Sequence, residues 1–142
     1  MVKIKLLYQD SVRPMKQHYG DAGFDVHALE SCLLWPGERH RFPLGFALEL
    51  PENWVAIISE RSGAAHKFGI ITLGNIIDCN YRGEVHATLF NSDAKVRYTI
   101  EQGDRIAQML IIPCYTGTEL EIVEELSPSN RGEGGFGSTN RS

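Results

Sequence analysis

The feature that most constrains the fold is an alternation of apolar and polar residues with a period of two. It recurs in three stretches, whose apolar members are Phe46, Leu48 and Leu50, then Val85, Ala87 and Leu89, and then Val96, Tyr98 and Ile100. Successive side chains of an extended strand point to opposite faces, so this pattern buries one face and leaves the other in solvent. The chain is therefore expected to fold from short β-strands.

Residues that favour tight turns separate these stretches. Pro36 and Gly37 in "WPGE" suit a type II turn, and "PEN", "NSDA" and "EQGD" are similar breaks. Many short strands at such spacing indicate an all-β sandwich or barrel. The segment "TELEIVEEL", which begins at Thr118, alternates at Leu120 and Ile122 and is predicted to be a further strand.

Length and charge limit the classes of function. The chain has 142 residues, which suits one domain with a hydrophobic core. Its net charge is −4, so we do not expect a basic surface that coats nucleic acid. A small anionic ligand, held by a few arginines and a metal ion, is compatible with this charge.

Nothing in the sequence points to a membrane or to secretion. No apolar run approaches the ~20 residues that a membrane span needs, and the N-terminal apolar stretch is too short and interrupted for a signal peptide. The cysteines Cys32, Cys79 and Cys114 lie far apart, which fits reduced thiols and not a zinc framework. We expect a cytoplasmic location, or the interior of a host cell if the chain is viral.

The stretch "NIIDCNYRGE" is the strongest candidate for chemistry. Asp78 follows two β-branched residues and precedes a polar turn, where a carboxylate can orient and deprotonate a water molecule. A turn aspartate that caps its own backbone explains the same pattern. Tyr81 and Arg82 beside it provide an aromatic platform and a phosphate-binding fork, or simply end a surface strand.

Other polar clusters carry weaker signals. Arg61, Ser62 and Gly63 place a guanidinium, a hydroxyl and exposed amides in one turn, which suits an oxyanion or phosphate, although such tripeptides are frequent in loops. Asp25 flanks a glycine turn, and Gln108 opens an apolar strand. Histidines with metal-site spacing, a Walker loop and a G-x-S-x-G elbow are all missing from the sequence.

The chain ends in "RGEGGFGSTNRS", a glycine-rich stretch of the kind that cradles phosphate. Such loops normally open a helix, but nothing follows this one. We therefore expect a β domain over residues 1–130, followed by a mobile glycine-rich tail over 131–142.

Taken together and in order, five segments resemble the five motifs of the trimeric dUTPases: "AGFDV" (22–26), "RSGAA" (61–65), "GNIIDCNYRGEV" (74–85), "GDRIAQM" (103–109) and "RGEGGFGST" (131–139). The resemblance implies an all-β, jelly-roll-like homotrimer with shared active sites, in which the tail over residues 131–142 closes over the active site as a lid. Glycines suit such a lid, because they leave the empty tail free and expose amides to phosphate when it closes. It also implies Mg²⁺-dependent hydrolysis of dUTP to dUMP and pyrophosphate, which limits uracil in DNA and supplies dUMP for thymidylate synthesis.

The resemblance also assigns roles to residues. Asp78 resembles the carboxylate that activates the attacking water, and Tyr81 the ring under the deoxyribose. Asp25 resembles the motif-one aspartate, near the metal and its waters. The implied contacts to uracil come from Gly74, Asn75, Ile76 and Ile77, with Phe136 stacking on the base; those to the phosphates come from Arg61, Ser62, Gly63, Gln108, Arg131, Gly137, Ser138 and Thr139.

Some positions depart from the family pattern. Glu60 stands where proline is usual, Asn75 replaces a common glycine in the uracil hairpin, and Asn80 and Asn140 replace a frequent aspartate and a glycine. Two alternatives to a dUTP diphosphatase share the fold: a dCTP deaminase or bifunctional relative, and a non-catalytic nucleotide-sensing module. Release of ammonia from dCTP would distinguish the deaminase.

Overall fold

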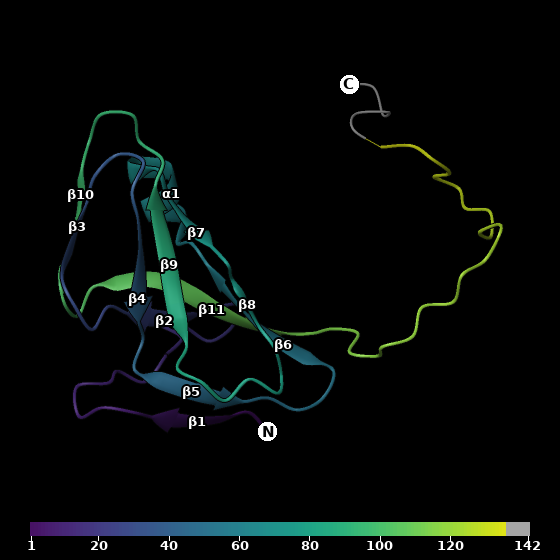
Figure 1. The fold of residues 1–142 in the computed structure, drawn as a ribbon, viewed down its shortest axis with the longest axis horizontal. Helices are drawn as coiled ribbons and strands as arrows, with labels where there is room; N and C mark the ends of the chain where they lie inside the picture. The colour runs from purple at the N-terminus through teal and green to yellow at the C-terminus, as the bar shows by residue number, and fades with distance from the viewer. Residues whose placement is uncertain (136–142) are drawn as a thin grey trace.

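The computed structural model describes residues 1–135, and over this range the chain folds into eleven strands and one short helix (Figure 1). The elements are β1 (Lys3–Leu6), β2 (Phe24–His27), β3 (Cys32–Leu34), β4 (Arg39–Pro43), β5 (Phe46–Glu49), β6 (Trp54–Ser59), α1 (Ser62–Phe68), β7 (Ile70–Leu73), β8 (Ile76–Ile77), β9 (His86–Asn91), β10 (Tyr98–Ile100) and β11 (Arg105–Pro113). The predicted all-β class is confirmed.

The strands form four small antiparallel sheets. The largest has the order β2-β11-β6-β8 and the next β4-β9-β7, while β1 pairs with β5 and β3 with β10. Neighbours in a sheet are mostly distant in sequence, so the chain crosses repeatedly between sheets. All four sheets contribute to one buried core, in which Phe42, Phe46, Ile58 and Leu89 are almost fully enclosed.

The period-two pattern predicts the buried face well in two of its three stretches. Phe46, Leu48 and Leu50 are buried, and β9 with the residue before it buries every second position from Val85. In the third stretch Val96 is 61% exposed and lies outside β10. The Asp93 carboxylate accepts hydrogen bonds from the N–H groups of Lys95 and Val96, and this local turn keeps Val96 out of the strand.

The predicted turn at "WPGE" is confirmed. Gly37 has a φ of 79°, which the third position of a type II turn requires, and the N–H of Glu38 donates to the carbonyl of Trp35 at 3.0 Å. The turn connects β3 to β4, which belong to different sheets.

Helix α1 was not expected, because residues 61–65 read as a turn. The helix ends at Gly69, whose left-handed φ of 64° lets its N–H reach back to the helix carbonyls. None of its seven residues is buried, so the helix needs no apolar stripe. Without such a stripe the sequence has no periodic pattern that would predict a helix here.

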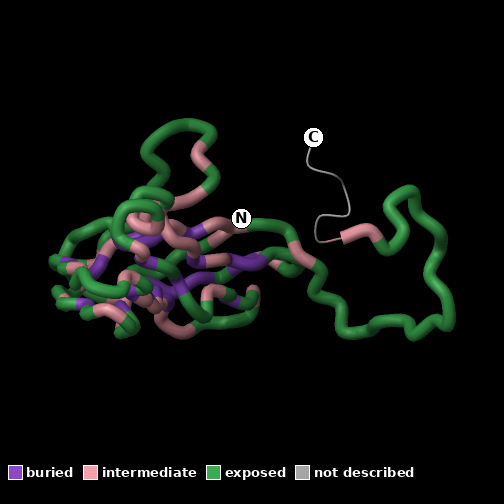
Figure 2. The backbone as a smooth tube through the Cα atoms, turned by 90° about the horizontal axis from the view of Figure 1, so that it is seen from above, coloured by how far each residue is buried: buried purple, intermediate pink, exposed green. Residues whose placement is uncertain are grey.

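The prediction of a strand from Thr118 is wrong in the structure of the single chain. Residues 114–135 contain no strand and leave the body of the molecule as an extended segment (Figures 1 and 2). Leu120, Ile122 and Leu126 are each at least 85% exposed. The alternating pattern is present, but among residues 1–135 no strand pairs with this segment.

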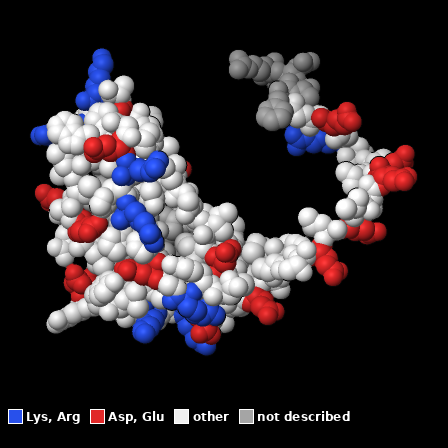
Figure 3. All heavy atoms as spheres, in the orientation of Figure 1, with Lys and Arg blue, Asp and Glu red and all other residues white. Residues whose placement is uncertain are grey.

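The surface carries charges of both signs, as expected from the small net charge of −4. Basic and acidic side chains mix over the visible face of the body, whereas the extended segment carries mostly acidic ones (Figure 3). Within residues 1–135, no helix has the length and apolar character needed to cross a membrane.

Candidate active site

Three adjacent strands bring distant parts of the sequence together. Strand β11 lies between β2 and β6, and Gln108 on β11 is paired with Asp25 on one side and Ser59 on the other. Arg61 is the second residue after the end of β6, so it lies close to Ser59 and Gln108. The strand register therefore gathers residues from the segments 22–26, 61–65 and 103–109.

These residues line a cavity of about 520 Å³, which we call the arginine pocket. Its lining combines backbone from two loops with charged side chains, and includes Asp21, Asp25, Arg61, Ser62, Gly63, Lys67, Tyr98, Arg105 and Gln108. Three of the lining residues are Arg or Lys and two are Asp, so a polyanion accompanied by a cation would suit the pocket.

Asp25 organises the two arginines. Arg105 Nη1 lies 3.2 Å from Asp25 Oδ2, and Arg61 Nε lies 3.6 Å from Oδ1 of the same carboxylate, whose side chain is 14% exposed. Arg61 Nη1 also donates to the carbonyl of Arg105 at 3.1 Å. Each guanidinium has five N–H donors, so both are held in place with donors left for a ligand.

Arg105 was not among the expected binding residues. Arg105 and Gln108 are three positions apart, and in a regular strand this spacing points their side chains to opposite faces. A bulge between Arg105 and Ala107 breaks the alternation, so both side chains line the arginine pocket. The sequence signal, "GDRIAQM", was present, but the bulge could not be read from it.

Gly23 fits closely against Gln108. A Cβ placed on Gly23 would lie 2.5 Å from Gln108 Oε1, so any larger residue would displace that side chain. Gln108 Nε2 donates to the carbonyl of Glu60 at 3.0 Å, which points the amide toward the start of α1. The glycine before β2 is therefore needed for packing against β11.

Burial perturbs two ionisable groups at this end of the sheet. The pKa of His27 lies below its usual value, first because of burial and further because of the nearby Arg105 and Arg61, against the opposing effect of Asp25. Its Nδ1 is buried, and no group in the described part of the chain forms a hydrogen bond with it. Burial also raises the pKa of Tyr98, a residue of the arginine pocket, which keeps its hydroxyl protonated.

A second cavity, of about 290 Å³, surrounds the turn between β7 and β8, which pair with β9 and β6 and not with each other. We keep the word hairpin for this chain reversal, residues 70–77, and call the cavity the hairpin pocket. It is lined by Gly74, Ile76, Ile77, Asp78 and Tyr81, together with Arg41, Glu84, Val85, His86 and Thr88. Gly74 has a φ of 63°, which lets the chain reverse between β7 and β8. Strand β8 pairs with β6 on one side and forms the edge of its sheet, so its other backbone edge is unpaired.

Asp78 and Tyr81 lie at the end of this hairpin. The Asp78 side chain is exposed, and its carbonyl accepts the N–H of Tyr81 in a tight turn. The Tyr81 hydroxyl donates to the carbonyl of Glu84 at 3.1 Å. A Cβ on Gly83 would overlap the Tyr81 ring, so glycine is required for the ring to fold over the turn.

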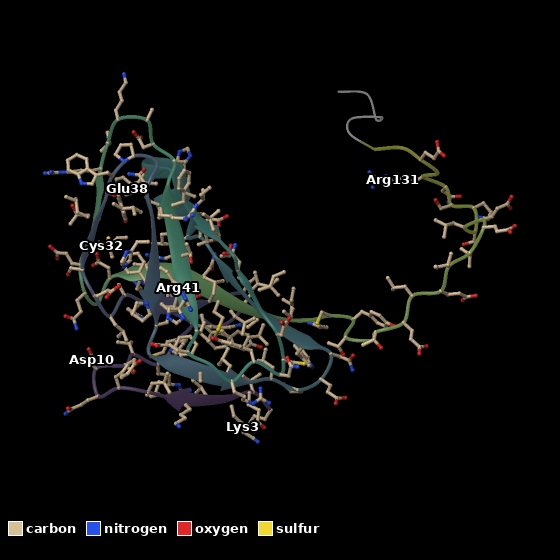
Figure 4. All side chains as sticks on the ribbon, in the orientation of Figure 1. Lys3, Asp10, Cys32, Glu38, Arg41 and Arg131 are labelled. Carbon is tan, nitrogen blue, oxygen red and sulfur yellow. The ribbon has the colours of Figure 1, made fainter. Side chains whose placement is uncertain are left out.

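Sequence reasoning missed the far wall of the hairpin pocket. Arg41, labelled in Figure 4, lies on β4 and is paired with Thr88 on β9. Its Nη2 lies 3.2 Å from His86 Nδ1. The alternation in β9 places His86 and Thr88 opposite the buried face. It could not show that β4 would bring an arginine beside them.

The expected site residues thus fall into two groups. Within residues 1–135 the two cavities share no lining residue. Asn75 lines neither cavity and is partly buried. Arg131 lies out on the extended segment, where its Nε donates to the carbonyl of Gly134 at 2.6 Å (Figure 4). Phe136, Gly137, Ser138 and Thr139 lie outside the described residues.

The family model described as dUTPase matches residues 10–140, almost the whole chain. The chain belongs to the dUTPase family. This match spans both cavities, so the arginine pocket and the hairpin pocket belong to one family domain.

Curated dUTPase relatives match at similar length. The deoxyuridine 5'-triphosphate nucleotidohydrolase of Leifsonia xyli is 43% identical over 128 residues, covering 89% of this chain and 84% of that protein. The Clostridium tetani enzyme of the same name is 42% identical, covering 99% and 97%. That of Paramecium bursaria Chlorella virus 1 is 37% identical, covering 96% and 95%. These relatives give no support to the deaminase alternative.

Solved dUTPases share the jelly-roll β fold of this chain. The Staphylococcus bacteriophage 80alpha dUTPase with dUPNHPP superposes with a TM-score of 0.87 at 31% identity, covering 99% of each chain. A mutant dUTPase from phage phi11 of S. aureus, which coordinates a structural Mg(II) ion, has a TM-score of 0.79 at 27% identity, covering 88% of this chain and 97% of that one.

The donor set of this dUTPase domain fits magnesium brought in with the substrate. Within residues 1–135, no three His, Cys, Asp or Glu side chains cluster to hold a metal by themselves. Mg²⁺ in nucleotide sites is usually bound by one or two carboxylates together with substrate phosphates and water. Asp25 and Asp21, both in the arginine pocket, match that pattern.

Proposed function

We propose that this chain is a dUTP diphosphatase that hydrolyses dUTP to dUMP and pyrophosphate, with Asp78 as general base. The observation that carries the assignment is the exposed Asp78 carboxylate beside Tyr81 at the end of a hairpin, within a domain of the dUTPase family. Three free cysteines suit the reducing interior of a cell, where we place the enzyme.

In the reaction, Asp78 takes a proton from a water molecule while the oxygen of that water attacks the α-phosphorus. The bond from that phosphorus to the oxygen bridging the α- and β-phosphates breaks, and pyrophosphate leaves. A carboxylate at a solvent-facing turn can reach a water without first giving up a buried ion pair. The attack requires that the triphosphate be held in line, which is the role we assign to the arginine pocket and the tail.

Uracil is recognised by the backbone of residues 74–77. Strand β8 is the edge of its sheet, so its free N–H and C=O groups can pair with the base as another strand would. A thymine methyl would collide with the hairpin, and cytosine would present its donors and acceptors in reverse. Tyr81, folded over Gly83, stacks under the deoxyribose and leaves no space for a 2′-hydroxyl.

The phosphates bind in the arginine pocket. Arg61, Ser62, Gly63 and Gln108 contact them, and the location of Arg105 adds this residue to the set. If Mg²⁺ binds with the substrate, Asp25 would be the carboxylate that holds it through water, and the ion would supply positive charge against the triphosphate. The tail closes the site, with Arg131, Gly137, Ser138 and Thr139 on the phosphates and Phe136 on the base.

The separation of the two cavities supports a homotrimer with shared active sites. If one chain supplied both parts of a site, its general base Asp78 and its phosphate-binding residues would be expected to line one cavity. Here they line two. The extended segment supports the same proposal, because Leu120, Ile122 and Leu126 are too exposed for a segment that stays in solvent. In the trimer this segment packs on a neighbouring chain.

Pyrophosphate release is the test. Purified protein is assayed with dUTP, UTP, dTTP and dCTP, with Mg²⁺ and then with a chelator. We expect dUTP to be strongly preferred, and chelation to lower the rate until Mg²⁺ is restored. Ammonia release from dCTP, or equal rates on dUTP and UTP, would contradict the proposal. Light scattering of the same sample reports whether the protein is a trimer.

A further inference from the structure

A chain of three polar side chains connects the two cavities inside one subunit. Thr72 on β7 donates its hydroxyl proton to Glu60 Oε2 at 2.8 Å. Asn75, in the turn between β7 and β8, donates through Nδ2 to the oxygen of Thr72 at 2.9 Å. We call this Glu60–Thr72–Asn75 arrangement the polar bridge.

The direction of the polar bridge is determined by its chemistry. A carboxylate only accepts hydrogen bonds, so the single hydroxyl proton of Thr72 goes to Glu60 and its lone pairs accept from Asn75. Thr72 is only 8% exposed, so water competes little for these bonds. The hydrogen bond from Thr72 is the main cause that holds the pKa of Glu60 below its usual value. The bridge therefore contains a charged carboxylate at neutral pH.

Each end of the polar bridge contacts a candidate site. Glu60 precedes Arg61, and its carbonyl accepts from Gln108 Nε2, a residue of the arginine pocket. Asn75 stands between Gly74 and Ile76 of the hairpin pocket, and its carbonyl accepts the N–H of Ile58 at 2.9 Å. A shift at one end would move the backbone at the other.

Two further observations single out these side chains. Asn75 Oδ1 is buried, and no other residue within 1–135 donates a hydrogen bond to it, so Nδ2 carries the side-chain hydrogen bond of Asn75 in the bridge. Glu60 and Asn75 are also two of the departures from the family pattern. A proline at 60 would offer no carboxylate and a glycine at 75 no amide, so the polar bridge depends on those departures.

We propose that Glu60, Thr72 and Asn75 are positioning residues, which hold the base-reading hairpin in register with the phosphate-binding loop. This inference rests on the proposed function. The side chains of the bridge act through the backbone of residues 74–77; they set where the β8 backbone edge lies when uracil binds. Loss of the bridge lets the hairpin shift, which weakens uracil binding and lets thymine in.

The test is Thr72→Val, which keeps the shape of the side chain and removes the hydroxyl. We expect KM for dUTP to rise about tenfold, the effect of losing a charge-assisted hydrogen-bond chain. The preference for dUTP over dTTP should fall by a similar factor, while kcat changes little. Thr72→Ser restores the hydroxyl and should return both values to near wild type.

A double variant tests whether Thr72 and Asn75 act through the same hydrogen-bond chain. Asn75→Gly should raise KM in the wild-type background and have no further effect beside Thr72→Val, because the bridge is already broken. Ser31→Ala is the control: its hydroxyl accepts only a surface hydrogen bond from the N–H of Gln102 at 2.9 Å. We expect this control to leave KM unchanged.

An unchanged KM and dUTP/dTTP ratio in folded Thr72→Val would overturn the inference, as would additive effects of Thr72→Val and Asn75→Gly. If Thr72→Val does not fold, Glu60→Ala and Asn75→Gly alone must show the same loss of preference, or the inference is wrong. Hydrogen exchange of residues 74–78 gives a readout without substrate. Faster exchange in Thr72→Val would support the polar bridge even if wild type did not hydrolyse dUTP, and unchanged exchange would contradict it.

Discussion

At the scale of single residues, close packing decides which side chains can act. Tyr81 folds over Gly83 and donates to the carbonyl of Glu84, so its ring is held although it is 42% exposed. Asp78 is exposed three residues earlier in the same turn. A rigid aromatic ring and a solvent-facing carboxylate in one turn suit recognition of a sugar beside an attacked phosphate.

Replacing the carboxylate should remove chemistry and keep binding. For Asp78→Asn we expect hydrolysis of dUTP to fall by roughly 10²–10⁴, as for a lost general base. Binding of dUTP with Mg²⁺, measured by calorimetry, should stay within about tenfold of wild type. A variant that hydrolyses dUTP at the normal rate would exclude Asp78 from the mechanism.

Replacing the ring should alter the choice of sugar. We expect Tyr81→Ala to lose stacking on the deoxyribose and to admit UTP, which narrows the ratio of kcat/KM for dUTP over UTP. Gly83→Ala should act in the same direction, because its Cβ would displace the ring. If neither variant changes the ratio, discrimination against ribose lies elsewhere in the site.

At the scale of elements, strand register gathers the arginine pocket. Strand β11 pairs with both β2 and β6, and its bulge turns Arg105 and Gln108 toward the same cavity. His27, at the end of β2, pairs with Arg105 and is partly buried beside two guanidinium groups. Its environment makes this end of the sheet sensitive to acid.

The sign of that sensitivity follows from the lowered pKa of His27. At a pH below 6.5, the usual pKa of histidine, His27 is protonated in the unfolded chain but stays neutral for longer in the folded chain. The free energy of unfolding therefore falls as the pH drops. We expect the thermal midpoint to decline between about pH 7 and 5.5, and less steeply in His27→Gln. His66→Gln, on the exposed surface of α1, should keep the wild-type slope. Equal slopes in all three proteins would contradict the role of His27.

At the scale of the whole molecule, the two cavities and the extended segment point to assembly. We predict complementation between two defective chains: one with Asp78→Asn and an intact tail, the other with Asp78 but truncated after Asn130. Each homotrimer should be nearly inactive. The truncated chain should still fold, because the last strand ends at Pro113.

Mixing the two chains by co-refolding should restore activity. In a closed ring of three, every mixed trimer has one place where an intact hairpin meets an intact tail. Random equal mixing makes roughly three quarters of the trimers mixed, so roughly a quarter of wild-type activity should return. Native mass spectrometry verifies mixing. No recovery in verified mixed trimers would mean that hairpin and tail come from the same chain.

The sequence by itself determined the fold class and most of the candidate site. Alternation in β9 depends on a local rule, that successive side chains of a strand face opposite ways, so its buried face could be read directly. In β5 the expected residues are buried, but Ala47 between them is buried as well. The type II turn at Gly37 is also local. The candidate residues came from the order of five motifs, and ten of them line one of the two cavities.

Only the tertiary structure decided what those residues face. The bulge in β11 brought Arg105 into the arginine pocket, and the pairing of β4 with β9 placed Arg41 beside His86. The separation of Asp78 from Arg61 and the polar bridge from Glu60 to Asn75 depend on which strands are neighbours. Strand neighbours are set by burial of the whole core, a sum over distant contacts that no local pattern of residues contains.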